Sequence, residues 1–290
     1  MPDRKFDPEH FFDHFSRFVE TSETGHVVER LNARYLGLIH ANRELIEGSS
    51  VLDLASHDGR FSFAALKNGA TRVVGIDAEP GFVETARANM DLYDVPRDRY
   101  NFVSGDMFEE IEMQEPCDVV FCFGILYHIN DHMLLLSRIA ETDPRTVIID
   151  TNVARLDAAL IELRNPLTGV PPNPGGQLEG YPSRAALDVM MASFGWTYTY
   201  FDWEASGLTE REQMHDYRTR RRVSVVVDCH RQALSPDDRA RAVAMVFERQ
   251  RDRRTQWAEI RKVANEVGTT PQALCVWVRK AERAARSPRR

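Results

Sequence analysis

The sequence has few cysteines and no long apolar run, and both absences narrow what the protein can be. Its four cysteines form no Cys-x-x-Cys pair, and two of them lie in one apolar segment, so we expect buried, reduced thiols. The longest apolar run, residues 119–127, is far shorter than the ~20 residues that cross a bilayer, and polar residues stand where a secretory signal would be apolar. These features predict a cytoplasmic protein that is neither secreted nor membrane-spanning.

Positive charge is scarce in most of the chain and concentrated at its end. Residues 235–290 carry 14 Lys and Arg against 7 Asp and Glu, a net charge of +7, whereas the remainder carries −14. Such an asymmetry indicates a basic appendage, because net charge governs non-specific binding and not fold. We therefore predict an N-terminal helical cap over residues 1–48, a main domain over residues 49–232 and a tail over residues 236–285.

Two apolar runs in the main domain end in acids. The run at residues 51–54 contains Asp53 and leads into a tight polar turn that opens a helix. The next run ends at Asp77, 24 residues further on, which is about the spacing of a carboxylate that binds ribose hydroxyls. In a doubly wound sheet, such a turn places backbone N–H groups and a helix N-terminus over a nucleotide. The pattern predicts an α/β fold with a nucleotide site.

Two further apolar runs extend this pattern to four strands. They are followed by the pair Asp106 and Met107 and by residues 124–128. At this point roughly residues 30–231 resemble the class I S-adenosylmethionine-dependent methyltransferases, because four motifs follow in the family's order and spacing. The first motif departs from the usual pattern of three glycines, since Ala55 and His57 occupy the first two glycine positions and only Gly59 is kept.

The resemblance implies a Rossmann-like, seven-stranded doubly wound sheet with helices on both faces, and S-adenosylmethionine as the cofactor. Asp77 would bind the ribose hydroxyls, Asp106 the adenine amine, and Asp53 either a group of the loop or the amino group of the methionine part. The cofactor contacts that we expect are Asp53, Ala55, Ser56, His57, Gly59, Asp77, Ala78, Asp106, Met107, Phe123 and Gly124.

The candidate catalytic residues are His128 and its neighbour Tyr127, which follow the fourth strand at the mouth of the crevice. A histidine with an ordinary pKa near 6.5 can accept a proton at neutral pH, so His128 is the best candidate for a general base. The alternative is that His128 only caps or packs against its surroundings. A metal site with Asp131 and His132 is a weaker alternative, and we expect no metal.

Residues 164–182 hold five prolines and four glycines, too many for a helix or a central strand. A loop this long in a compact domain is usually functional. The resemblance places a substrate lid here, which makes Asn173 and Tyr181 candidate substrate contacts.

Near the N-terminus, a cluster of phenylalanines at helical spacing, between residues 11 and 18, could line a substrate cavity or form packed core. Arg34 and Tyr35 follow on the next predicted helix. They could be presented to the cofactor, or be a solvated arginine beside a core tyrosine.

The tail has a helix-turn-helix pattern. Residues 257–264 and 271–281 read as amphipathic helices around a short turn, with Pro271 at the start of the second. The segment resembles the DNA-binding part of insertion-element transposases, with Trp277, Val278 and Arg279 in the second helix. Two interpretations stay open: a DNA-binding appendage, weak in affinity, or a fragment acquired from a mobile element. In either case we expect the main domain to keep its core without the tail.

Three functions follow from these patterns. The leading one is transfer of a methyl group to an oxygen or nitrogen atom of a small molecule. The alternative within enzymes is modification of the transfer-RNA wobble uridine, which residues 124–128 and 181–183 resemble and the −14 charge of the body disfavours. The third is a DNA-binding regulator that senses the cofactor.

Overall fold

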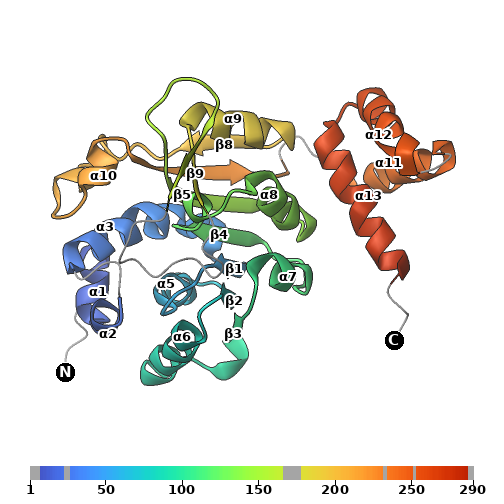
Figure 1. The fold of residues 1–290 in the computed structure, drawn as a ribbon. Coiled ribbons are helices and arrows are strands. Elements are labelled where there is room, and N and C mark those ends of the chain that lie inside the picture. The colour runs from blue at the N-terminus through green and yellow to red at the C-terminus, as the bar shows by residue number, and fades with distance from the viewer. Residues whose placement is uncertain (1–6, 23–26, 166–177, 231–233, 251–252, 287–290) are drawn as a thin grey trace.

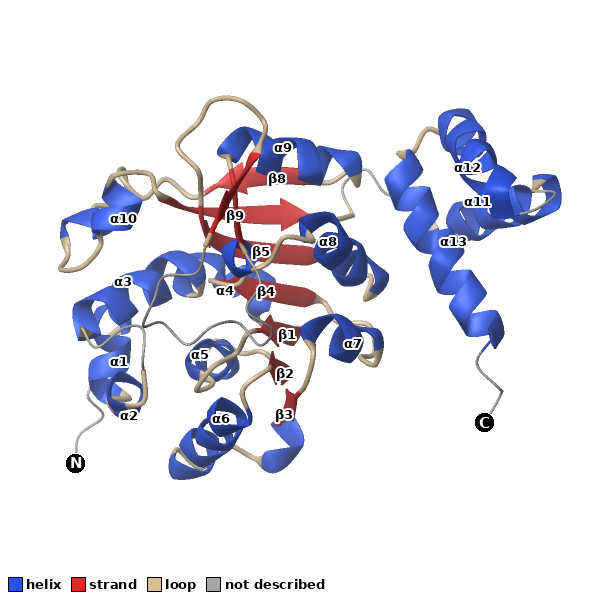
Figure 2. Ribbon diagram, in the orientation of Figure 1, coloured by secondary structure: helices blue, strands red, loops and turns tan. Residues whose placement is uncertain are grey.

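The computed structural model describes residues 7–22, 27–165, 178–230, 234–250 and 253–286. At its centre lies a sheet of seven strands in the order β3-β2-β1-β4-β5-β9-β8 (Figures 1 and 2). Neighbouring strands from β3 to β5 are parallel, whereas β9 is antiparallel to both β5 and β8. The strands are β1 (Ser50–Leu54), β2 (Arg72–Asp77), β3 (Tyr100–Ser104), β4 (Val119–Phe123), β5 (Thr146–Asn152), β8 (Thr197–Tyr200) and β9 (Arg222–Asp228). The predicted Rossmann-like sheet is confirmed.

The central strands are apolar on both sides because helices cover both faces of the sheet. Along β4, Val119 and Phe121 belong to one core cluster, and Val120 and Cys122 belong to the other. The first cluster lies under α5 (Arg60–Lys67) and α6 (Pro80–Leu92), and the second under α7 (Met107–Glu112), α8 (His132–Glu141) and α9 (Arg184–Ser193). This alternation is the period-2 pattern of a strand between two layers of helices.

The N-terminal helices pack their phenylalanines into the first core cluster. These helices are α1 (Phe11–His14), α2 (Arg17–Glu20), α3 (Val28–Leu38) and α4 (Arg43–Ile46). Phe11, Phe12 and Phe18 are fully buried, and the Phe11 ring stacks on Tyr35 with 4.0 Å between centroids. The cluster is therefore packed core, and Tyr35 is part of it.

A short hairpin stands where the sequence predicted only a loop. β6 (Ile161–Arg164) and β7 (Glu179–Pro182) pair antiparallel as a separate two-stranded sheet. The prediction of an irregular segment over residues 164–182 is wrong at both ends, because a short strand outside the central sheet tolerates a terminal proline. The candidate substrate residue Asn173 lies outside the described residues.

The tail is a three-helix unit whose last helix also packs against the main domain. α11 (Pro236–Arg249), α12 (Arg253–Val267) and α13 (Pro271–Arg286) enclose a small core of their own. The turn between α12 and α13 contains Gly268 at φ +74°, a left-handed conformation that favours glycine. α13 contacts both α8 and α9, and its Val276 is 2% exposed within the second core cluster of the body.

Ion pairs reinforce this contact. Arg283 of α13 pairs with Glu112 at 3.3 Å and also with Glu141, and Arg239 of α11 pairs with Asp143 at 2.8 Å. α13 therefore belongs to the core of the tail and to the second core cluster of the body, and the expectation that the main domain keeps its core without the tail stays a prediction. Leu274, Cys275, Val276 and Val278 are buried and the other residues of 271–278 are partly exposed. This is the half of a second helix that a helix-turn-helix presents to DNA.

Candidate active site

The carboxyl ends of the parallel strands meet at one edge of the sheet, where an open α/β sheet binds its ligands. Leu54 lies opposite Ile76, and Asp77 opposite Ser104, so β1, β2 and β3 end together. The turn after β1, Asp77 and Asp106 are thereby brought to one place, as the sequence predicted.

The turn after β1 keeps a left-handed backbone at each position where glycine would be usual. The φ angles are +56° at Ala55, +51° at His57 and +78° at Gly59. A non-glycine residue in this conformation costs roughly 1–2 kcal/mol. A Cβ atom at Gly59 would lie 3.0 Å from the Phe102 ring and 3.1 Å from Ala86, which accounts for the one glycine kept.

Asp77 and Asp106 are held by backbone N–H groups. Asp77 accepts hydrogen bonds from the N–H groups of His57, at 2.8 Å, and Glu79, at 3.0 Å, and so ties the end of β2 to the turn after β1. Asp106 caps α7 by accepting from the N–H of Phe108 at 2.8 Å. A carboxylate has about four lone-pair sites, so both acids keep the capacity to accept hydrogen bonds from a ligand.

Two polar atoms of the same turn have no protein partner in the part of the chain that the structure describes. They are Ser56 Oγ and His57 Nε2, both buried. The His57 ring stacks on Phe82 with centroids 3.7 Å apart. Because buried polar groups are normally hydrogen-bonded, this turn fits a polar ligand.

The remaining predicted cofactor residues surround this edge. Met107 and Ala78 follow β3 and β2, and Met107 packs on the second core cluster. Phe123 ends β4, 7% exposed, with its ring edge-on to Phe61, and Gly124 follows at φ +80°.

Asp53 points into the protein and not into the crevice. Its side chain is 2% exposed and accepts a hydrogen bond from Ser62 Oγ at 2.6 Å. The partner found is therefore a side chain of α5 and not a group of the loop, and the role toward the methionine part stays a prediction. Burial raises the pKa of Asp53 to about 7, although the bond from Ser62 opposes the shift.

The buried Asp53 carboxyl should make stability depend on pH. A carboxyl with a raised folded-state pKa contributes stability below its ordinary pKa near 4, and this contribution is lost as pH rises through about 7. We expect Asp53→Asn to raise the melting temperature at pH 8 by about 2 °C or more and to flatten the decline between about pH 4 and 7. Thermal melts across pH measure both, with the exposed Asp98→Asn as control. A lower melting temperature for Asp53→Asn at pH 8 would contradict the prediction.

Tyr127 and His128 lie in a 3-10 turn, η4 (Leu126–His128), against the β6–β7 hairpin. His128 Nδ1 is 3.3 Å from Glu179 Oε1, and the Tyr181 hydroxyl donates to the other oxygen of Glu179 at 2.9 Å. The Tyr127 and Tyr181 ring centroids are 5.5 Å apart. The structure thus brings together the two predicted catalytic residues and one predicted substrate contact.

Burial lowers the pKa of His128, and Arg222 adds to this, while the nearby Glu179 opposes it. His132 points elsewhere, since its Nε2 lies 2.9 Å from the carbonyl oxygen of Leu126 and 3.0 Å from that of Gly180. Among the residues described, no three His, Cys, Asp or Glu side chains are grouped as metal ligands.

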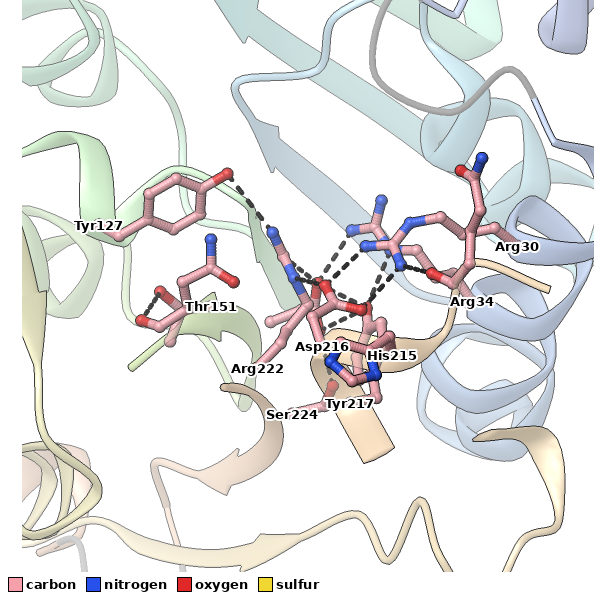
Figure 3. A network of polar contacts seen from close by, with 12 residues as sticks. Arg30, Arg34, Tyr127, Thr151, His215, Asp216, Tyr217, Arg222 and Ser224 are labelled. Atoms are coloured by element: carbon pink, nitrogen blue, oxygen red, sulfur yellow. Dashed lines mark hydrogen bonds and ion pairs between the residues drawn. The ribbon is translucent and has the colours of Figure 1, made fainter. Parts of the chain in front are cut away.

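A buried network of charged side chains adjoins the site and was not predicted (Figure 3). Its centre is Asp150 within β5, whose side chain is fully buried. Asp150 accepts hydrogen bonds from Arg34 at 2.9 Å, Arg222 at 2.8 Å, Ser224 at 2.7 Å and Tyr217 at 3.0 Å. Burial alone would raise the pKa of Asp150, but the two guanidinium groups outweigh it and lower the pKa.

The network continues through α10 (His215–Arg218) to α3. Asp216 accepts two hydrogen bonds from Arg30, both at 2.8 Å, and one from Arg222 at 3.1 Å. Arg222 also lies 3.4 Å from the Tyr127 hydroxyl, which links the network to η4. Arg34 joins the cap to the sheet and is 11% exposed, so the alternative of a solvated arginine is wrong, although the core tyrosine beside it is confirmed. Its presentation to the cofactor stays a prediction.

Comparison with known proteins gives three kinds of match. Residues 51–142 match the family model described as "Methyltransferase domain". The ribosomal RNA large subunit methyltransferase I of Photobacterium profundum is 30% identical over 87 residues, which are 30% of this chain and 21% of that protein. The tRNA U34 carboxymethyltransferase of the same organism is 26% identical over 204 residues, 68% of this chain and 58% of that protein.

Among solved structures, an S-adenosylmethionine dependent methyltransferase from Mesorhizobium loti superposes with a TM-score of 0.50 at 14% identity, over 68% of this chain and 97% of that one. This likeness shows the shared fold. The chain spans only 20–26% of the length of the ribosomal RNA relatives, and these matches involve 26–35% of this chain. The chain therefore has the fold of the class I methyltransferases, and the part that matches the methyltransferase family model is residues 51–142.

Proposed function

We propose that the protein is an S-adenosylmethionine-dependent methyltransferase that acts on an oxygen or nitrogen atom of its acceptor. The observation that carries the proposal is the convergence of the turn after β1, Asp77 and Asp106 on one edge of the sheet, within the residues that match the methyltransferase domain model. Ser56 Oγ and His57 Nε2 support it, because a nucleoside with an amino-acid part would supply the partners that these buried atoms lack among the described residues.

The residues divide into a cofactor side and an acceptor side. Asp77 would bind the ribose hydroxyls, Asp106 the adenine amine, and the turn around Ser56 the methionine part. When bound, the cofactor supplies a methyl group on a sulfonium. On the acceptor side, His128 accepts the proton of the attacking hydroxyl or protonated amine. After the transfer, His128 would release this proton to solvent.

Binding tests the cofactor half of this proposal. Calorimetry should detect one site per chain for S-adenosylmethionine and for its demethylated product, and absence of binding would overturn it. We expect Asp77→Ala to weaken binding by roughly ten- to a hundredfold, because charge-assisted hydrogen bonds contribute about 1.5–3 kcal/mol. The matched control is Glu79→Ala, which removes an exposed acid two residues away. Equal affinities of Asp77→Ala and the wild type would remove Asp77 from the ribose role.

Two acceptor classes have support. A small molecule fits the net −14 of residues 1–234, because nucleic-acid binding relies on Lys and Arg that neutralise phosphates. A transfer RNA is supported by the 204-residue match to the tRNA U34 carboxymethyltransferase, which extends beyond the cofactor-binding residues. Labelled methyl transfer into a cell extract discriminates between them: label that ribonuclease converts from precipitable to soluble identifies RNA, and label unaffected by ribonuclease in the low-mass fraction identifies a small molecule.

A cofactor-sensing DNA regulator is the least supported function. Half of residues 271–278 of α13, the part that would read DNA, are buried in the docked tail, and the others are only partly exposed. A mobility-shift assay on the full chain at several salt concentrations tests it.

A further inference from the structure

His128 lies beside a buried carboxylate that comes from a distant part of the chain. Glu179 on β7 is 51 residues away in sequence, is 8% exposed, and places Oε1 3.3 Å from His128 Nδ1. A carboxylate at this position accepts a hydrogen bond from Nδ1–H, which makes Nε2 the nitrogen that can take a proton.

We propose that Glu179 is a positioning residue that fixes His128 in the tautomer with the proton on Nδ1 and so aims Nε2 at the methyl acceptor. This inference rests on the proposed function for the acceptor side. Glu179 itself transfers no proton: His128 takes the acceptor's proton on Nε2, and the negative charge of Glu179 stabilises the imidazolium that forms.

The carboxylate is itself held in place. The Tyr181 hydroxyl donates to Glu179 Oε2 at 2.9 Å, and the Arg164 guanidinium lies 3.9 Å from the centroid of the Tyr181 ring. The strand that carries Glu179 is fastened to η4 by His132, whose Nε2 lies within 3.0 Å of the carbonyl oxygens of Leu126 and Gly180. η4 therefore supplies the base, and the hairpin supplies both the carboxylate and the Tyr181 hydroxyl that binds it. His132 of α8 links η4 to the hairpin.

Among the described residues, charged and titratable groups on β7, β9 and η4 face His128. Glu179 and Tyr181 lie on β7, Arg222 on β9, and Tyr127 precedes His128 in η4. Of these, Glu179 is the carboxylate, so its removal should lower the pKa of His128 and not raise it.

The test is Glu179→Gln, whose amide can donate to Nδ1 and so favours the opposite tautomer. In the ligand-free protein, NMR of the imidazole nitrogens should show His128 shifting away from the Nδ1–H tautomer and titrating at lower pH. In the methyltransferase assay, we expect kcat to fall at least about tenfold and the acidic limb of the pH profile to move to lower pH, with the affinity for the demethylated cofactor unchanged. Glu179→Asp, which keeps the charge, should retain more activity than Glu179→Gln.

The control is Glu204→Gln, which lies outside the hairpin and whose exposed carboxylate pairs with Arg220. It should leave the His128 tautomer and kcat as in the wild type. An unchanged His128 tautomer and pKa in folded Glu179→Gln would overturn the proposal, and so would an unchanged kcat. The NMR result needs neither cofactor nor acceptor, so a failure of the proposed function, seen as no cofactor binding by the wild type, is distinguishable from a failure of the His128–Glu179 pair.

Discussion

Replacing Asp150 with alanine is expected to lower the free energy of unfolding by about 3–5 kcal/mol, because it leaves Arg34 and Arg222 buried without their shared carboxylate. The two guanidinium groups are 11% and 8% exposed and both lie within 2.9 Å of Asp150. Urea denaturation at pH 7 measures the change. The wild type should also lose stability as pH falls through the lowered folded-state pKa of Asp150, since a depressed carboxyl stabilises the folded state only above its ordinary pKa near 4.

Asp216→Ala is the graded comparison for this experiment. Asp216 binds Arg30 and Arg222 but is 27% exposed, so solvent screens its partners and the loss should be clearly smaller. Equal losses for the two variants, or a loss below about 1 kcal/mol for Asp150→Ala, would show that the buried network contributes less than its geometry indicates.

Replacing His128 with alanine is expected to lower kcat by roughly 10²-fold or more and to leave the affinity for the demethylated cofactor nearly unchanged. A general base acts in the transition state and not on the bound cofactor, so the two quantities should separate. Because burial lowers the pKa of His128, the wild type should keep its full rate down to a pH below the ordinary histidine value near 6.5 and lose it at lower pH as the imidazole is protonated.

The control is His230→Ala, which removes a partly exposed histidine that follows β9, paired with Asp143 far from η4. Turnover and affinity should both match the wild type. If His128→Ala lowers both quantities together, or neither, the alternative that His128 only caps or packs is correct.

The cofactor side could be predicted because its signals are local. Asp53, Asp77 and Asp106 each end or follow an apolar run, and parallel strands bring their carboxyl ends to one edge. The same logic predicted the parallel strands at the centre of the sheet. What it could not give is the direction of a side chain: Asp53 points inward to Ser62.

The acceptor side and the charged network beside it were harder to predict, because the residues that pair there are far apart in sequence. Arg34 and Asp150 are 116 residues apart, and Asp150 and Arg222 are 72. No periodicity relates such pairs. The available signal was a charge inside an apolar strand, at Asp150 in β5, since a carboxylate there must be paired when it is buried. Glu179 gave less signal, since it lies in a segment whose prolines and glycines predict a loop.

The docking of α13 has a thermodynamic consequence for any partner of the tail. α13 acts as an intramolecular ligand of the body, so a macromolecule that binds residues 271–278 must compete with α8 and α9 for them. Its apparent affinity falls by the fraction of molecules in which the helix is undocked. By thermodynamic linkage, a change that strengthens the contact between α13 and the body lowers the affinity of that partner by the same factor. Binding of the partner weakens the contact between α13 and the body equally. Affinity for DNA measured on a tail without its body would therefore exceed the affinity of the whole chain.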